Sequence, residues 1–174
     1  MFFQFLLPWL FLLVFAFFLF FYFHKYLVIL TQKYKLVESE NIARRQQSVQ
    51  DALFPLRVQA SERLVLFLER IRPMALVTRH LEGSFLKHQM QMKMLQNIRD
   101  EFEHNLSQQI FVGESVWQTV KAAREDVSQK INVVMSGLSD DASAADAAGL
   151  LIAIDIELID RAIKMIKEEM TRNL

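Results

Sequence analysis

The residue types with the clearest capacity for chemistry are Glu101 and His104, which stand in the sequence Glu-Phe-Glu-His. Three residues apart on a helix, a carboxylate and an imidazole lie on one face, and helical di-iron bundles use this Glu-x-x-His unit. Such sites need a second unit and two further glutamates, and the sequence contains no second Glu-x-x-His. We therefore expect an ion pair on a polar helix face and predict no metal site, cofactor or catalytic residue.

Other reactive or ligand-binding motifs are absent from the sequence. It has no cysteine, no Gly-x-Ser-x-Gly elbow and no glycine-rich phosphate loop, and its 4 glycines are scattered. The basic pairs Arg44–Arg45 and Arg70–Arg72 lack interleaved aromatic residues, so we expect no nucleic-acid partner and place them on a membrane-proximal surface. The sequence thus predicts a protein that is not an enzyme.

The elements that would position these residues begin with an apolar segment. Residues 1–23 contain 10 phenylalanines and no Asp, Glu, Lys, Arg or His. About 20 apolar residues cross the hydrocarbon layer of a membrane as a helix. A cleaved signal would have a basic start and small residues at its cleavage site, and a soluble core helix would need protein on every side. We interpret this segment as an uncleaved transmembrane anchor in contact with the lipid bilayer.

Charge and aromatic residues orient the predicted anchor. Lys25, Lys33 and Lys35 follow the segment and no basic residue precedes it, which predicts a cytoplasmic C-terminal side and an N-terminus on the opposite face. The phenylalanines are either lipid-facing or packed against a larger membrane subunit. The predicted anchor residues are Trp9, Phe11, Phe15, Phe18, Tyr22, Lys25 and Tyr26.

The net charge is zero but is unevenly distributed. Residues 25–99 carry 13 Lys and Arg against 6 Asp and Glu, and residues 100–174 carry 7 against 14. This asymmetry suits a basic end close to an anionic membrane surface, and it equally suits two faces of one bundle that attract each other.

The rest of the chain predicts helices with short connections. We expect a juxtamembrane helix that frays near Gln46 and a helix break at Pro55. The predicted domains are therefore 1–50, the anchor and juxtamembrane helix, and 51–174, the cytoplasmic bundle. Further helices are predicted over 56–71, with a break at Arg72–Pro73, over about 84–110 after a break at Gly83, and from a capping box at Ser115–Gln118 to Gly137. The fold class is all-α, a transmembrane helix followed by an antiparallel bundle.

Two stripes of apolar residues matter for packing. In the helix over 84–110 we expect Leu95, Ile98, Phe102, Leu106 and Ile110 to be buried, while Met90, Met92 and Met94 fill gaps in the core or form a binding surface. From Ala145 to Met170, apolar residues alternate spacings of four and three, as in a heptad repeat. The candidate helix–helix seam of this last helix is Ile152, Ile156, Ile159, Ile163 and Ile166.

Two stretches, Glu62–Ile71 (ERLVLFLERI) and Arg99–Val112 (RDEFEHNLSQQIFV), resemble an uncharacterised family of membrane-anchored helical proteins from Bacteroidota. The resemblance covers about residues 53–135 and implies no activity, only the inner membrane of a Gram-negative bacterium. The polar part of the second stretch is either a docking patch or the hydrogen-bonded end of a helix beside Trp117. The candidate docking residues are Arg99, Glu101, Glu103, His104, Gln108 and Gln109.

Three functions remain as hypotheses. The first is a non-enzymatic accessory subunit whose Phe-rich helix docks on a larger integral membrane protein or complex and whose bundle braces or regulates it. The second is a membrane-tethered scaffold that forms a homo-oligomer through the C-terminal heptad helix. The third is an enzyme or metal protein that uses Glu101 and His104. A pulldown with native mass, the mass of the soluble part, and elemental analysis discriminate among them.

Overall fold

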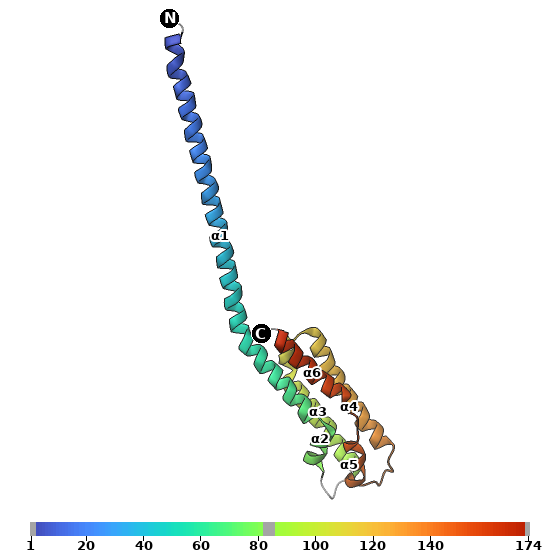
Figure 1. Ribbon diagram of the computed structural model, residues 1–174. Coiled ribbons are helices and arrows are strands. Elements are labelled where there is room, and N and C mark those ends of the chain that lie inside the picture. The colour runs from blue at the N-terminus through green and yellow to red at the C-terminus, as the bar shows by residue number, and fades with distance from the viewer. Residues whose placement is uncertain (1–2, 82–85, 173–174) are drawn as a thin grey trace. The chain divides into compact units, whose positions relative to one another are not determined.

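The computed structural model describes residues 3–81 and 86–172, which are helical with no strand among them (Figure 1). Helices account for 89% of the chain, and the predicted all-α class is confirmed. The elements are α1 (Phe3–Arg70), α2 (Pro73–His80), α3 (Lys87–Asn105), the 3₁₀ helix η1 (Leu106–Ile110), α4 (Glu114–Ser136), α5 (Ala144–Ile152) and α6 (Glu157–Arg172). The chain forms two compact units, Met1–Ala52 and Leu53–Leu174.

Helix α1 includes residues of both units. The predictions that the helix frays near Gln46 and breaks at Pro55 are therefore wrong. The helix continues past Pro55, which removes one amide donor and crowds the carbonyl of Asp51 without ending the element. The boundary between the two units falls after Ala52, within one turn of this proline. The predicted break at Arg72–Pro73 is confirmed, because α1 ends at Arg70 and α2 begins at Pro73.

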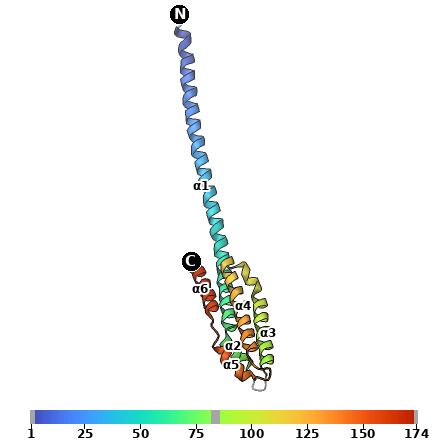
Figure 2. The ribbon, with the colours of Figure 1, turned by 90° about the vertical axis from the view of Figure 1, so that its right-hand side faces the viewer.

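The second unit is built around one apolar core. The last part of α1, α3, α4 and α6 lie side by side, and α2 and α5 lie together at one end of this unit (Figures 1 and 2). The fully buried large side chains are Leu64, Phe67, Leu68, Ile71, Leu76, Met90, Met94, Ile98, Ile131, Met135, Leu151 and Ile159. Met90 and Met94 therefore belong to the core, whereas Met92 is exposed.

The region over 84–110 differs from its predicted single helix. The predicted break at Gly83 and start at Ser84 lie outside the described residues, and the α-helix begins at Lys87. It ends at Asn105, where a 3₁₀ turn follows with three residues per turn in place of 3.6. Because this change rotates the following side chains, Leu106 and Ile110 are exposed and do not continue the buried stripe of Ile98 and Phe102.

The ends of α4 are formed differently from the prediction. Its N-cap is Gly113, so Ser115 and Gln118 form no capping box, and the Gln118 amide donates to Glu114 instead. At the other end, beside Gly137, Lys87 reaches across from α3. Its Nζ donates to the carbonyl oxygens of Met135 at 3.1 Å and of Leu138 at 2.5 Å, and lies 3.4 Å from Asp140. A buried ammonium therefore satisfies one carbonyl in the last turn of α4 and one just beyond its end.

We expect K87M to destabilise the second unit by about 2–3 kcal/mol, because two carbonyls lose a charged donor inside the protein. The measurement is the free energy of unfolding from urea titrations followed by circular dichroism. K167M, which removes an exposed lysine of α6, is the matched control and should change the value by less than about 0.5 kcal/mol. Equal effects of the two substitutions would contradict this role of Lys87.

The prediction of one heptad helix from Ala145 to Met170 is wrong, since α5 ends at Ile152 and α6 begins at Glu157. Between the two helices, the Asp155 carboxylate accepts the amide of Glu157 at 3.1 Å and so caps the start of α6. The backbone carbonyl of Asp155 accepts Lys130 Nζ of α4 at 2.9 Å. The 4–3 spacing of apolar residues therefore continues across two separate helices.

A capping box that the sequence interpretation missed begins α5. The hydroxyl of Ser143 accepts the amide of Asp146 at 3.1 Å and donates to its carboxylate at 2.7 Å, while the Ser143 amide donates to the same carboxylate at 3.0 Å. The hydroxyl and then the amide of Ser143 lower the pKa of Asp146 below its ordinary value.

A lowered pKa means that the ionised carboxylate of Asp146 stabilises the fold above its ordinary pKa of 3.8, and that this contribution is lost as the pH falls through the lowered value. We expect D146N to melt below the wild type at pH 6 and the difference to shrink as the pH falls from about 5 towards 2. Thermal melts of both proteins across this range test the prediction. A difference that stays constant with pH would contradict it.

Candidate functional site

The apolar part of α1 is the first candidate site. Among the described residues, one helix is long and apolar enough to cross a membrane, and it is the part of α1 that begins at Trp9. The most apolar stretch of this helix has no buried residue. All side chains over 9–52 are exposed. Trp9 is 70% exposed and Tyr22 is 76% exposed, so both aromatic residues at the ends of the predicted span are uncovered. The other predicted anchor residues, Phe11, Phe15, Phe18, Lys25 and Tyr26, share this exposure.

The predicted docking patch on α3 and η1 is divided by the fold. Glu101 forms an ion pair with Arg70 at 3.1 Å, and Gln108 is buried and donates to Ser107. The other candidates, Arg99, Glu103, His104 and Gln109, are exposed. Glu101 is thus bonded to α1, and the described residues contain no group of three or more His, Asp or Glu side chains arranged to hold a metal ion.

An aromatic cluster lies beneath this patch. The Phe102 ring stacks on Trp117 with centroids 5.5 Å apart and tilts against Phe67 at 5.8 Å, while the Arg124 guanidinium lies 4.5 Å from the Phe102 centroid. Rings in offset contact and a cation over a ring face both stabilise packing. This arrangement favours the structural interpretation of the stretch, in which its polar residues finish a helix beside Trp117.

The two basic pairs have separate positions. Arg44 and Arg45 are exposed on α1, but Arg70 bonds Glu101, and Arg72 bonds Glu69 at 2.6 Å and Asp160 at 2.7 Å. The hydrogen bond that Arg72 donates to Glu69, which has the largest effect, and the one that it donates to Asp160 raise the pKa of Arg72 above its ordinary value. Arg70 and Arg72 therefore tie the end of α1 to α3 and α6, which corrects their assignment to a free basic surface.

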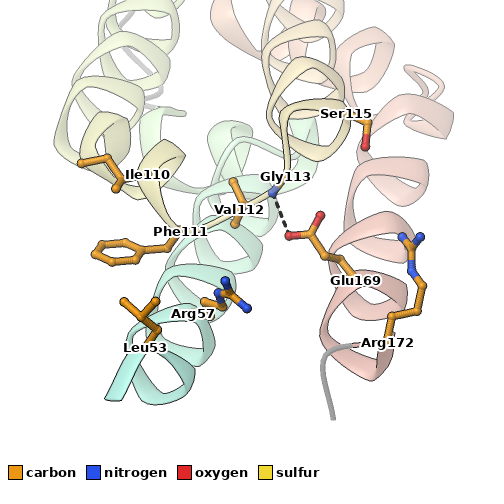
Figure 3. A pocket seen from close by; sticks show the side chains of 9 residues that line it. All are labelled: Leu53, Arg57, Ile110, Phe111, Val112, Gly113, Ser115, Glu169 and Arg172. Carbon is orange, nitrogen blue, oxygen red and sulfur yellow. Dashed lines mark hydrogen bonds between the residues drawn. The ribbon is translucent and has the colours of Figure 1, made fainter. Parts of the chain in front are cut away.

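A groove in the second unit has a volume of about 710 Å³ (Figure 3). It lies between α1, the turn that joins η1 to α4, and the last turns of α6. Its lining residues are Leu53, Arg57, Ile110, Phe111, Val112, Gly113, Ser115, Glu169 and Arg172. Apolar side chains and two guanidinium groups meet here from segments far apart in the chain, which is why sequence patterns did not reveal the groove.

One hydrogen bond closes the side of the groove between α4 and α6. The Glu169 carboxylate accepts the amide of Gly113 at 2.8 Å, as the dashed line in Figure 3 marks. A Cβ atom at Gly113 would lie 2.5 Å from the other carboxylate oxygen, so this close approach requires a glycine or a displaced Glu169. The bond also places a negative group at the N-terminus of α4, where the helix dipole favours it.

Comparison with known proteins places the chain in a family. The model of a family of unknown function, DUF7935, matches residues 1–173. The chain belongs to DUF7935. No curated protein and no solved structure matches it. The resemblance to a family without known activity is confirmed, and the match extends beyond residues 53–135 to the apolar segment.

The candidate seam of this DUF7935 protein lies largely inside its own core. Ile159, Ile163 and Ile166 are buried within the second unit, whereas Ile152 is 43% exposed and Ile156 is partly buried. A second copy could pair with the buried three only by displacing α6 from its own chain. The structure therefore favours the seam as an intramolecular contact, and no described feature favours the scaffold hypothesis.

Proposed function

We propose that this protein is a single-pass membrane protein whose helical second unit acts as a non-enzymatic accessory subunit of a larger integral membrane protein. The observation that carries the proposal is the uncharged apolar stretch of α1, whose side chains are exposed over the length of a membrane span. Large exposed apolar surfaces mark sites of interaction with lipid or with another protein.

The continuity of α1 supports an anchor over a cleaved signal or a soluble core helix. A cleaved signal ends in a small-residue site, and α1 continues as a helix from the apolar stretch to Arg70. A core helix would be covered by its own chain, and the side chains of this stretch are uncovered. The same helix that would cross the membrane also contributes Leu64, Phe67 and Leu68 to the core of the second unit.

The basic residues that follow the apolar stretch support a cytoplasmic second unit. Lys25, Lys33 and Lys35 come directly after it, and the positive-inside rule then places the N-terminus in the periplasm of a bacterial inner membrane. In the cytoplasm, α1, α3, α4 and α6 would form an antiparallel bundle. The absence of a catalytic motif in the sequence supports a bracing or regulatory role.

Purification of the full-length protein from its native membrane tests the proposal. The protein would be crosslinked in cells, extracted in mild detergent, and analysed by mass spectrometry and native mass. We expect one larger membrane protein at a fixed ratio. A monodisperse monomer without crosslinked partner would refute the accessory role, and a complex of identical copies would replace it with the scaffold.

A further inference from the structure

We propose that the membrane covers α1 as far as Leu30, past His24 and Lys25, and that the Lys25 ammonium binds the phosphate of a phospholipid in the cytoplasmic leaflet. This inference deepens the proposed function and rests on it, because it needs α1 to cross a membrane. It moves the cytoplasmic end of the span from Phe23 to Leu30 and assigns a ligand to Lys25.

The first argument is the apolar turn that follows Lys25. Residues 27–30 are Leu-Val-Ile-Leu, and all four side chains are exposed. Successive residues of an α-helix are rotated by about 100°, so four in a row point to all sides of α1. A docked protein helix covers one face, whereas the hydrocarbon of a bilayer surrounds the whole circumference. A span that ended at Phe23 would leave this turn in water.

The second argument is length. Trp9 and Leu30 are 21 positions apart, which is about 32 Å along a helix and matches a hydrocarbon layer of about 30 Å. Lys33 and Tyr34 follow within about one turn, and the Tyr34 side chain is 72% exposed. Lysine and tyrosine are enriched where a span meets the cytoplasmic interface. A span from Trp9 to Leu30 therefore has interfacial residues at both ends.

Two polar side chains near this end are compatible with apolar surroundings. The Thr31 hydroxyl donates to the carbonyl oxygens of Leu27 at 3.0 Å and Val28 at 2.8 Å, so it needs no water as a partner. The His24 ring lies near the preceding turn, with its centroid 6.3 Å from that of Phe20. Neither side chain opposes the burial of this turn in the bilayer.

The third argument is the charge of Lys25. With histidine neutral at pH 7, this ammonium is the single charge in residues 9–30. The nearest acidic residue along α1 is Glu38, 13 residues and about 20 Å away, so the described part of the first unit offers no ion pair. Lys25 lies five residues, or about 7.5 Å, before Leu30, and a long lysine stem brings its ammonium towards the interface.

Phosphate is the ligand that this position favours over a carboxylate of the partner. Phospholipids surround the whole span, so a phosphate is available whichever face of α1 carries Lys25. A partner's carboxylate would have to lie at the same depth and on the same face. An ammonium and a phosphate oxygen form a charge-assisted hydrogen bond, which offsets the loss of water around Lys25.

The chain has no cysteine, so single cysteines introduced along α1 report where the membrane ends. The full-length variants L27C and L30C would be placed in vesicles of phosphatidylethanolamine and phosphatidylglycerol. A charged maleimide present on both sides of the membrane measures their labelling rates, each relative to the rate in denaturing detergent. F18C, which lies inside the span under either boundary, and N41C, which lies outside under either, are the controls.

We expect L27C and L30C to react about tenfold more slowly than N41C and at rates close to that of F18C, because the apolar layer excludes a charged reagent. Rates of L27C and L30C close to that of N41C would overturn the proposal and leave a span that ends at Phe23. A fast reaction of F18C as well would refute the membrane span itself, and with it the proposed function.

Native mass spectrometry of the full-length protein in micelles with phosphatidylglycerol tests the phosphate contact. We expect K25Q to retain about fivefold less lipid than the wild type, as one lysine near an anionic surface contributes. K25R should retain as much as the wild type. K167Q, which removes an exposed lysine of α6, is the matched control and should also retain as much. Undiminished retention by K25Q, or an equal loss in K167Q, would overturn the phosphate contact.

Copurification with K25Q separates the lipid from a carboxylate of the partner as the ligand. A partner kept by K25Q at the wild-type ratio supports the lipid. A partner lost with K25Q and kept with K167Q assigns Lys25 to the partner, which overturns the proposal and leaves the accessory role intact. No partner with the wild type refutes the accessory role, and the labelling rates still decide where the span ends.

Discussion

If the proposed anchor spans a membrane, we expect the double substitution F15R/L19R to move the protein out of the membrane fraction. Both residues lie in the middle of the apolar stretch, with side chains 56% and 54% exposed. One arginine near the centre of a membrane-spanning helix costs about 2.5–3.5 kcal/mol, so two cost about 5–7 kcal/mol. Since 1.4 kcal/mol is a factor of ten, insertion becomes about 10⁴-fold less favourable.

The measurement is the distribution of the protein between pellet and supernatant after an alkaline carbonate wash. I42R/V49R is the matched control, because both residues are exposed and apolar on the same helix but lie beyond the apolar stretch. We expect the control to stay in the pellet. Wild type found in the supernatant would refute a membrane span, and wild type found without residues 1–23 would identify a cleaved signal.

The second large effect is expected from F102A, which should destabilise the second unit by about 3–5 kcal/mol. The substitution removes a ring that is 9% exposed and that joins Phe67, Trp117 and Arg124. Domains are stable by about 5–15 kcal/mol, so a large part of the stability is lost. Urea unfolding followed by circular dichroism measures the change.

The control for F102A is I110A, which truncates an exposed apolar residue eight positions later. We expect a loss below about 0.5 kcal/mol for I110A, because the side chain is already in water. A large effect of I110A together with a small effect of F102A would mean that the stretch over 99–112 packs in another register. That result would also remove Ile110 from the rim of the groove.

The sequence predicted best where one physical rule acts alone. In α4, apolar residues recur on one helical face over 23 residues, and Val116, Val120, Ala123, Val127 and Ile131 are buried. Periodicity failed where local hydrogen bonds compete with it. Asp155 caps the start of a separate helix, α6, by accepting the amide of Glu157, and this bond leaves no trace in the spacing of the isoleucines.

The groove escaped sequence analysis for a different reason. Leu53 and Arg172 are more than a hundred positions apart and line the same groove only in the folded second unit. Ile110 was assigned to the core because a regular helix would have put it there. Only the change to three residues per turn at Leu106 exposes it, and a 3₁₀ turn has no strong sequence signature.

The core of the second unit has a consequence for how this protein is made. It joins Leu64 and Phe67 of α1 to Ile159 and Ile166 of α6, so it cannot close until the last helix has left the ribosome. Chains emerge N-terminus first, and 147 residues (10–156) follow Trp9 before α6 begins at Glu157. In the proposed membrane protein, the apolar helix is thus available for insertion while the rest is still unfolded. Folding of the second unit then begins on a chain already tethered to the bilayer.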